Sequence, residues 1–453
     1  MKKKIIRMFW LFALLSIVSA VCFSAPQAQP TKITLWSNDR HDMDYMNKVV
    51  AAYNNNNKDN IKLELVIQAD NLDQMLKLAA SSKQSPDLFV FNMPEMAEKY
   101  VESNLMLPQN KYITAKLKRK IGLESLLCEG YNLFNGQIYY IPTVAKSGRR
   151  LIYNKDLFKK AGINKPPVTV DEMVNDAIKI TKVGEGKAFG FVLPGMGGHL
   201  GRIITSCAEM SGVKEYDFKT GKFAFDGFKP FILAVKKIIE SGAMMPGYIS
   251  MKIDPLRVQF AEGNIGMYGN ASQEVGVLNQ QFPAKCDWGA APPPTSNGKV
   301  KGALTYSFVR GFCISPQSKN PDQAWKVIEY LMSDEVMIGY VQGGYGMPTF
   351  KNIASKAQIP AGMKGFKDFL QLSYERIYPP LPSVQVEGKI WQDALWEACI
   401  PGGPNVDDVI SKLNTNYNKA LDKAVQQGST KRLIISNYDP LNPGKGAWEY
   451  KTN

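Results

Sequence analysis

Histidine is nearly absent from this chain of 453 residues, which contains only His41 and His199. No His-Glu-x-x-His sequence occurs, so a zinc hydrolase is not expected. A Ser-His-Asp hydrolase would have to take its base from these two histidines, and no Gly-x-Ser-x-Gly turn is present to display a serine. The sequence therefore predicts a protein that is not an enzyme. A glycosidase remains open as an alternative, because it needs only two facing carboxylates.

Sequences that hold cofactors are missing as well. There is no Gly-x-x-x-x-Gly-Lys-Ser/Thr loop for phosphates, and Gly195, Gly197 and Gly198 lack the spacing of a dinucleotide-binding fingerprint. No zinc-finger or RNA-binding signature occurs either. We therefore expect no cofactor, no bound metal and no nucleic-acid partner.

Cysteine is scarce, and no two cysteines stand at metal-ligand spacing. One or two disulfides with a thiol left over are compatible with the pattern, and so are buried free thiols acting as small apolar groups. The five cysteines that follow the N-terminal segment are Cys128, Cys207, Cys286, Cys313 and Cys399.

The first 28 residues are typical of a secretory signal peptide. Basic residues at positions 2–4 and 7 precede an apolar stretch from Met8 to Val21, and small residues follow. We expect export, with the mature protein in the periplasm or at the cell surface. Cys22 adds the alternative of a lipid anchor. No later segment approaches the roughly 20 apolar residues that a membrane-spanning helix needs.

The formal charge of +14 is spread along the chain, and its densest run is Lys116–Lys120. A solvated helix face is the simpler interpretation of this run. The alternative is affinity for anionic polymers at a cell surface.

Strand-like and helix-like segments alternate from residue 31 onward. This alternation predicts a parallel sheet covered by helices on both faces. The expected strands are 33–36, 61–67 and 88–91, and the expected helices are 42–53, 72–80 and 94–100.

Beyond residue 140 the pattern becomes more helical, and we find no internal repeat and no flexible linker. Two lobes that share crossover strands therefore fit better than two separate domains. The expected strands are 149–153, 265–270 and 288–294, with a hairpin-like stretch at 303–315. The expected helices are 170–180, 230–241, 254–262 and 321–332, followed by a region at 366–425 that is helical apart from proline-rich breaks at 379–382 and 401–404.

Seven segments, in order, resemble one family. The most recognisable is 153–162, Tyr-Asn-Lys-Asp-Leu-Phe-Lys-Lys-Ala-Gly. The chain is similar to the extracellular solute-binding proteins, family 1, of ABC transporters, which bind sugars and oligosaccharides. The seven segments are 33–39, 85–89, 140–142, 151–162, 166–172, 320–325 and 344–348.

This resemblance implies an α/β, two-lobed periplasmic-binding-protein fold of type II-like topology, with a ligand cleft between lobes joined by three crossovers. The expected divisions are 1–28 for the signal peptide, 29–142 plus 302–348 for the N-terminal lobe, and 143–301 plus 349–453 for the C-terminal lobe. The family has no catalytic residues. Its members close on a carbohydrate by hinge motion and deliver it to permease subunits of an ABC transporter, and we expect a monomer.

Sugar recognition needs aromatic rings for the apolar ring faces and fixed polar groups for the hydroxyl edges. Loops at the carboxyl ends of parallel strands supply both. The residues predicted to contact the ligand are Trp36, Asn38, Asp39, Arg40, Asn92, Glu95, Asn270, Trp288 and Trp391.

Two departures from the family pattern add further candidates. Gln273 stands where the family often has a stacking tryptophan, so hydrogen bonding is expected there. Arg149 and Arg150 occupy a segment that is usually neutral and borders the cleft, and Arg310 is a third arginine candidate. Because arginine binds carboxylates with two parallel hydrogen bonds, the narrower hypothesis is an acidic, uronate-containing oligosaccharide.

Three rival functions remain open. A binding protein of the same architecture for a polyamine or a metal chelate is the first, although polyamine binding would need several carboxylates in the cleft. A secreted carbohydrate-active enzyme is the second. A surface adhesin that uses the basic face is the third.

Overall fold

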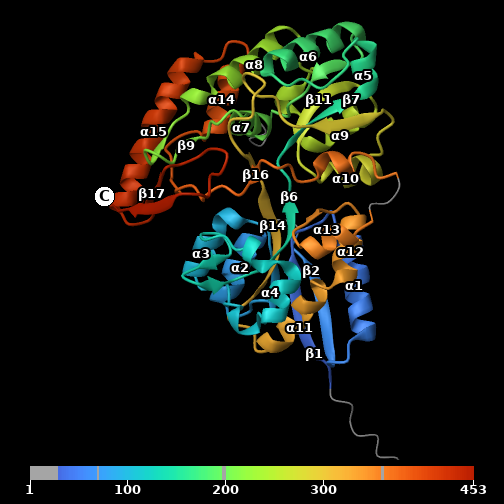
Figure 1. Cartoon of the computed structure of the whole chain (residues 1–453), viewed down its shortest axis with the longest axis vertical. Helices are drawn as coiled ribbons and strands as arrows, with labels where there is room; N and C mark the ends of the chain where they lie inside the picture. The colour runs from blue at the N-terminus through green and yellow to red at the C-terminus, as the bar shows by residue number, and fades with distance from the viewer. Residues whose placement is uncertain (1–28, 69–70, 196–199, 359–361, 453) are drawn as a thin grey trace, which may run out of the picture.

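The computed structural model describes residues 29–68, 71–195, 200–358 and 362–452. It has two lobes, one above the other in Figure 1, joined by strands that run through the centre of the molecule. The predicted signal peptide, including Cys22, lies outside the described residues, and so does His199.

The N-terminal lobe is built on a six-stranded sheet in the order β15-β6-β14-β3-β1-β2. β1, β2 and β3 are parallel, whereas β14 runs antiparallel to both β3 and β6. The parallel pairing expected for the strands at 33–36, 61–67 and 88–91 is confirmed, and the sheet becomes mixed because β14 returns from the other lobe in the opposite direction. The strand bounds are β1 (Thr31–Ser37), β2 (Ile61–Ile67), β3 (Leu88–Phe91), β6 (Pro142–Lys146), β14 (Ser307–Ile314) and β15 (Met347–Pro348).

Side-chain alternation along β3 shows how this sheet is covered on both faces. Leu88 and Val90 pack in the core that contains α1, α11 and α12, whereas Phe89 and Phe91 pack against α2 and α3. The helices of this lobe are α1 (Met43–Asn56), α2 (Leu72–Ser81), α3 (Ala97–Glu102), α4 (Ala115–Ile121), α11 (Pro321–Leu331), α12 (Asp334–Gln342) and α13 (Lys351–Lys356).

The C-terminal lobe contains a four-stranded sheet in the order β12-β7-β11-β8, packed among helices. Its strands are β7 (Arg150–Asn154), β8 (Phe189–Phe191), β11 (Ile265–Asn270) and β12 (Trp288–Ala291). Its helices are α5 (Lys155–Lys160), α6 (Val170–Gly184), α7 (Leu200–Met210), α8 (Lys229–Glu240), α9 (Ile253–Ala261), α10 (Glu274–Gly276), α14 (Trp391–Cys399) and α15 (Val406–Gln426).

Short strand pairs complete the structure. One of them, formed by β17 and β18, makes a hairpin at the C-terminal end, level with the junction of the lobes in Figure 1. The pairs are β4 (Leu133–Phe134) with β5 (Gln137–Ile138), β9 (Tyr216–Asp217) with β10 (Lys222–Phe223), β13 (Leu304–Thr305) with β16 (Glu375–Arg376), and β17 (Arg432–Ser436) with β18 (Ala447–Lys451).

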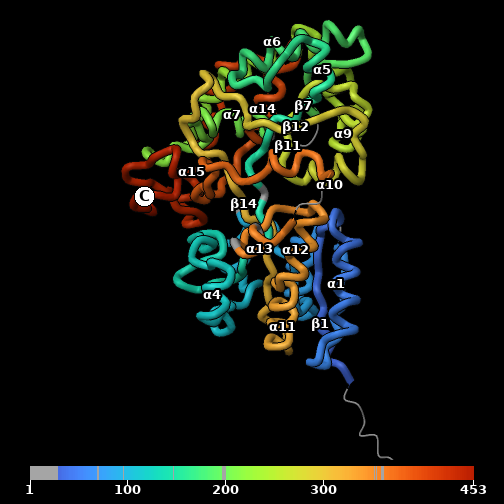
Figure 2. The backbone as a smooth tube through the Cα atoms, turned by 45° about the vertical axis from the view of Figure 1, so that its right-hand side comes forward, coloured from blue at the N-terminus to red at the C-terminus, as the bar shows by residue number. Residues whose placement is uncertain are grey.

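The chain crosses between the two sheets three times. β6 leads to β7, β13 leads to β14, and the segment after β15 returns to the C-terminal lobe, as the tube in Figure 2 shows. Because β6 pairs with β14 and β15 along its length, and α13 packs on α4 and α12, we propose that the N-terminal lobe comprises residues 29–146 and 307–356, which departs from the expected 29–142 plus 302–348.

Several local predictions are confirmed, among them the strands at 61–67, 88–91 and 265–270. The hairpin expected at 303–315 is wrong, since this stretch holds the short β13 and one long strand. The helical region expected at 366–425 contains α14 and α15, but 370–390 forms no helix. Pro379, Pro380 and Pro382 interrupt that segment, and proline cannot continue a helix.

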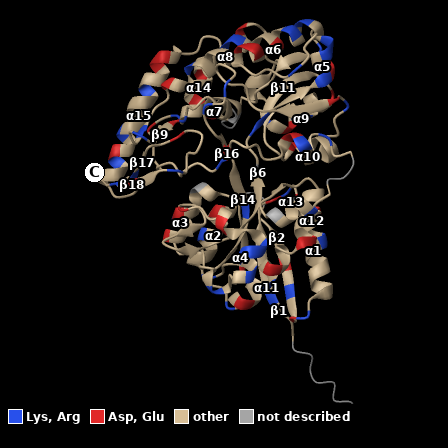
Figure 3. Ribbon diagram, viewed as in Figure 1, with Lys and Arg blue, Asp and Glu red and all other residues tan. Residues whose placement is uncertain are grey.

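All five described cysteines are unpaired, so the disulfide alternative is not realised in this structure. The run Lys116–Lys120 lies mostly on α4, with its charged side chains exposed to solvent. Figure 3 shows basic and acidic residues interspersed over the outer helices. The simpler interpretation of the basic run, a solvated helix face, matches this placement.

Within the described ranges, none of the helices combines the length and apolar character needed to cross a bilayer.

Candidate functional site

Three of the predicted ligand residues meet where β1 and β3 end. Asn92, directly after β3, donates from its Nδ2 atom to Asn38 Oδ1 at 2.8 Å and to Asp39 Oδ1 at 3.1 Å. The Asp39 backbone N–H donates to Ser37 Oγ at 3.1 Å, which fixes the loop. Parallel strands end at the same edge of a sheet, so residues far apart in sequence form one polar group.

Arg310 lies beside this group, on the neighbouring strand β14. The β14–β6 register shifts on both sides of Arg310, and irregularities of this kind redirect side chains. The guanidinium is buried, with Nη2 3.1 Å from Asp42 Oδ2 and Nε 3.6 Å from Asp39 Oδ2. It also lies 4.5 Å from the centre of the Tyr340 ring, within the range of a cation–π interaction.

In this cluster a buried positive charge, on Arg310, lies close to the carboxylates of Asp39 and Asp42. Burial raises the pKa of the Asp42 carboxyl, and the charge of Arg310 opposes that shift. Burial alone would lower the pKa of Arg310, but Tyr340, Asp42 and Asp39 outweigh it and the pKa is raised. Arg310 is therefore charged at any physiological pH. Its Nε and Nη2 atoms still make no hydrogen bond of good geometry to the described residues.

The opposite wall comes from the C-terminal lobe, just after β11. Asn270 is buried and holds this turn together: its Nδ2 atom donates to Glu274 Oε1 at 2.8 Å, and its Oδ1 atom accepts from Gln273 Nε2 at 3.0 Å. Glu274 is neutralised in turn by Arg257. Ser272 Oγ and Gln273 Oε1 are buried without a hydrogen-bond partner among the described residues.

These walls enclose a cavity of about 70 Å³ between the lobes. A water molecule needs roughly 10–15 Å³ in this measure, so the cavity holds a few waters and no complete sugar ring. A saccharide therefore enters when the lobes separate, or extends beyond the cavity. The lining residues are Asp39, His41, Asn92, Val144, Ser272, Gln273, Val309, Arg310, Tyr340, Tyr345 and Gly346.

Aromatic rings close one side of this cavity. Tyr45, Tyr340 and Tyr345 form a mutually packed cluster with ring centroids 5.4–6.0 Å apart. His41 Nε2 lies 3.4 Å from the Tyr340 hydroxyl and 3.3 Å from the Tyr345 carbonyl oxygen. Burial raises the pKa of Tyr45 to about 12, so its hydroxyl stays protonated.

Other predicted residues are placed elsewhere. Arg150 is fully buried and pairs with Glu375 at 2.7 Å; it also donates to the carbonyl oxygens of Gly148, Asp368 and Leu370. All of these partners belong to the chain itself. Arg150 therefore has a structural role here, and we leave it out of the proposed site.

The three tryptophans predicted to contact the ligand, Trp36, Trp288 and Trp391, also lie away from the cavity. Trp288 is 1% exposed, and Trp391 is 7% exposed in the core of the C-terminal lobe, where it packs on Phe225 and Phe228. Trp36 is half-buried against the core that contains α2 and α3. Their packing is the ordinary packing of core rings.

Three charged residues that were predicted to contact the ligand remain: Arg40, Arg149 and Glu95. Arg40 is exposed, and Arg149 is half-buried. Burial lowers the pKa of Arg149 and the nearby Glu209 carboxylate opposes that shift. The side chain of Glu95 lies outside the described residues.

Sequence reasoning missed Asp42, which pairs with Arg310, and seven residues that line the cavity: His41, Val144, Ser272, Val309, Tyr340, Tyr345 and Gly346. Ser272 had a signal, since it stands next to the predicted Gln273 in the same turn. Tyr345 had one too, because it lies within the family-like segment 344–348. Tyr340 is on an amphipathic helix, where a tyrosine reads as a core residue.

In the described part of the chain, no group of three or more His, Cys, Asp or Glu side chains is arranged to hold a metal ion. The cavity offers a solute hydrogen-bonding groups and aromatic rings. That chemistry suits a polar, uncharged organic solute.

Two α/β lobes, three crossovers and a cavity with walls from both lobes define a two-lobed solute-binding protein. The profile of the bacterial extracellular solute-binding protein family matches residues 37–338, and the chain belongs to this family. The resemblance and the fold class predicted from sequence are thereby confirmed.

Two curated relatives share about a quarter of their aligned residues with this chain. A binding protein of Brucella abortus (strain 2308) is 27% identical over 295 residues, covering 64% of this chain and 68% of the relative. The maltotriose-binding protein of Pyrococcus abyssi is 24% identical over 335 residues, covering 72% of this chain and 67% of the relative.

Solved structures agree on the fold. A solute-binding protein from Thermotoga lettingae, bound with α-D-tagatose, has a TM-score of 0.67 and 21% identity, covering 86% of this chain and 100% of that one. The GacH receptor of Streptomyces glaucescens has a TM-score of 0.68 and 18% identity, covering 86% and 98%.

Proposed function

We propose that this protein is the substrate-binding component of an ABC importer, exported from the cytoplasm, and that it captures an oligosaccharide without chemically changing it. The observation that carries the proposal is the cavity that joins Asp39, Asn92 and Arg310 of one lobe to Gln273 of the other. A ligand that bridges these groups stabilises the closed arrangement of the lobes. The closed protein, a monomer, then delivers the ligand to the permease subunits.

The charges around the cavity favour a neutral saccharide over an acidic one. Arg310 faces two carboxylates, and Arg150 is held by Glu375, so neither offers a free positive charge to a uronate. Asp39 and Asn92 instead present the acceptor and donor groups that sugar hydroxyls need. A polyamine requires several carboxylates in its site, whereas the described lining of this cavity contains one, Asp39, and it faces Arg310.

A thermal-shift screen with paired neutral and uronate-containing oligosaccharides tests this proposal. A ligand that binds only the folded state raises the Tm by mass action. We expect neutral oligosaccharides to raise it and their uronate partners to raise it less. Tighter binding of the uronates would contradict the neutral assignment, and release of reducing ends during the incubation would indicate an enzyme.

Asp39→Asn provides the residue-level check, with Asp171→Asn as its matched control, since Asp171 is exposed on α6. We expect Asp39→Asn to weaken binding of whichever neutral oligosaccharide scores best by about tenfold, because a charge-assisted hydrogen bond is lost. Calorimetry measures the affinity. Equal losses in both variants would exclude this cavity as the site.

A further inference from the structure

A much larger hollow lies between the lobes, separate from the polar cavity. It consists of three adjoining parts of about 610, 300 and 240 Å³. Neighbouring parts share lining residues: Glu129 and Tyr450 in one case, Tyr378 and Pro379 in another. The largest part alone falls within the roughly 300–1,000 Å³ that small-ligand sites occupy. We call the whole hollow the aromatic groove.

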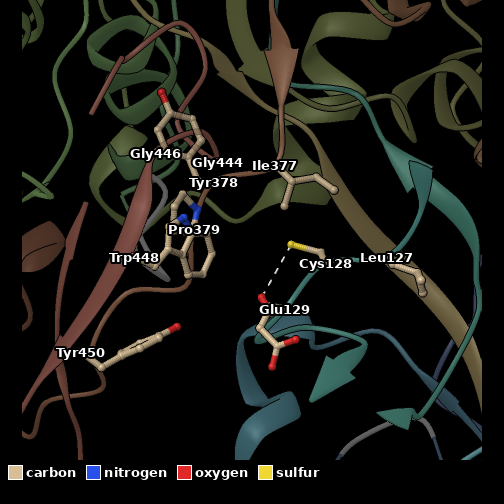
Figure 4. Close-up of a pocket in the computed structure, with 10 residues that line it drawn as sticks. All are labelled: Leu127, Cys128, Glu129, Ile377, Tyr378, Pro379, Gly444, Gly446, Trp448 and Tyr450. Atoms are coloured by element: carbon tan, nitrogen blue, oxygen red, sulfur yellow. Dashed lines mark hydrogen bonds between the residues drawn. The ribbon is translucent and has the colours of Figure 1, made fainter. Parts of the chain in front are cut away.

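The walls of the aromatic groove come from both lobes. Residues 127–131 of the N-terminal lobe face the segment 377–381 and the β17–β18 hairpin, and Figure 4 shows Trp448 and Tyr450 of the hairpin across from Cys128 and Glu129. The hairpin itself is held by the C-terminal lobe. Tyr216 donates its hydroxyl to Leu433 O at 2.9 Å, and the Ile435 N–H donates to Phe218 O at 2.8 Å. Hinge motion therefore changes the width of the groove.

The walls of the groove contain both aromatic rings and polar groups. The rings are Tyr131, Tyr306, Phe308, Tyr378, Trp448 and Tyr450. Trp448 is half-buried and Tyr450 is 46% exposed, so both keep ring surface available to a ligand. Glu98, Lys99, Glu129 and Asn135 supply charged and amide groups beside them.

This mixture matches the two surfaces of a pyranose chain, whose C–H faces stack on rings and whose hydroxyl edges need hydrogen-bonding groups. Neighbouring residues of the chain line the two hollows. On β14, Phe308 lines the groove and Val309 the cavity; after β3, Pro94 lines the groove and Asn92 the cavity. The cavity is too small for one sugar ring, so a longer saccharide needs further surface, and the groove offers rings and polar groups for it.

We propose that the aromatic groove is a second saccharide subsite, which selects extended oligosaccharides over short ones. The proposal rests on the proposed carbohydrate-binding function and adds the chain length of the ligand. The hairpin that carries Trp448 and Tyr450 lies outside the family-matched residues 37–338. The subsite is thus a feature of this chain that the match to the family does not account for.

Calorimetry on the mature chain tests the subsite, with linear neutral gluco- and xylo-oligosaccharides of two to seven units as probes. We expect affinity to rise at least tenfold from the disaccharide to the longest probe of the preferred series. Tyr450→Ala and Trp448→Ala should each remove most of this gain and leave disaccharide affinity unchanged. Leu233→Ala is the matched control, because Leu233 is 43% exposed on the remote helix α8.

The outcomes separate the two proposals. Affinities that do not depend on probe length, or a length gain that survives both ring substitutions, would overturn the subsite and leave the function intact. If no saccharide binds, the proposed function fails and the subsite with it. A dimer that forms in the wild-type chain and is lost in Tyr450→Ala would assign the groove to a second copy of the chain and overturn the subsite. Circular dichroism establishes that each variant is folded.

Discussion

Two buried arginines near the junction of the lobes differ in how completely the chain satisfies them. Arg150 has one carboxylate and three carbonyl oxygens around its guanidinium, all at hydrogen-bonding distance. Arg310 has two carboxylates nearby, but its Nε and Nη2 atoms form no hydrogen bond of good geometry in the described structure. Arg310 lines the polar cavity, and Arg150 is not among the residues that line it.

The difference shows that burial and charge alone do not mark a binding residue. A buried donor without a good partner carries a desolvation cost, and a ligand that accepts its hydrogen bond relieves that cost. We therefore propose that Arg310 contacts the ligand and that Arg150 holds the fold together. The same substitution at both positions, arginine to lysine, makes this contrast measurable.

Arg150→Lys should have the largest effect on stability. Lysine keeps the charge but loses the planar fork, so several buried carbonyl oxygens lose their donor, at a cost of about 3 kcal/mol of unfolding free energy. Urea unfolding measures the change. Affinity for the best neutral oligosaccharide should stay within about twofold, which is near the limit of calorimetric comparison. If the unfolding free energy of Arg150→Lys equals that of the wild type, the hydrogen bonds of Arg150 contribute little to stability.

Arg310→Lys should give the opposite pattern. Loss of its free N–H groups weakens oligosaccharide binding about tenfold or more, because a charged hydrogen bond is worth roughly 1.5–3 kcal/mol. Unfolding free energy should fall less than in Arg150→Lys, since fewer well-made bonds are lost. If both lysine variants lose stability and affinity to the same extent, the distinction between the two arginines fails.

Gln273→Ala tests the facing wall with a smaller change. Its Oε1 atom has no partner among the described residues and its Nε2 atom makes one bond, to Asn270. We expect a two- to tenfold loss of affinity, which corresponds to one neutral hydrogen bond of about 0.5–1.5 kcal/mol. Gln259→Ala on α9 is a suitable control, because Gln259 lies outside the cavity.

The smallest effect concerns pH. Because burial raises the pKa of Asp42 in the folded protein, its contribution to stability is present below the unfolded value near 3.9 and is lost as pH rises through the folded pKa. The wild type should therefore lose stability between acidic and neutral pH, and the Asp42→Asn variant should lose less over the same range. Urea midpoints across that range measure the slope. An unchanged slope would show that Arg310 cancels the burial cost completely.

The predicted ligand residues fall into two groups: those whose position follows from local sequence and those whose position depends on tertiary packing. Asn38, Asp39 and Asn92 follow short buried strands, and strand ends converge wherever a parallel sheet forms, so local pattern sufficed to group them. Trp288 and Trp391 were expected to stack on sugar, but a tryptophan that packs in a core has the same local sequence as one at a surface. Only tertiary packing distinguishes these cases.

The arginine predictions show the same limit. The strand pattern predicts that Arg149 and Arg150 point to opposite faces, and Arg150 is buried whereas Arg149 is half-buried. It held no information about Glu375, which lies 225 positions further along and takes up the charge of Arg150. The β17–β18 hairpin was missed altogether, because short strands after a long helix leave a weak periodic signal.

The position of Trp448 has a practical consequence. Its half-buried indole belongs to the C-terminal lobe and faces N-terminal-lobe residues across the largest hollow. The hinge motion proposed above would narrow this hollow, remove water from the indole and shift its emission to shorter wavelength. The chain contains seven tryptophans, and subtracting the spectrum of Trp448→Phe isolates this one. The protein thus carries its own fluorescent gauge of lobe closure, one that needs no attached dye.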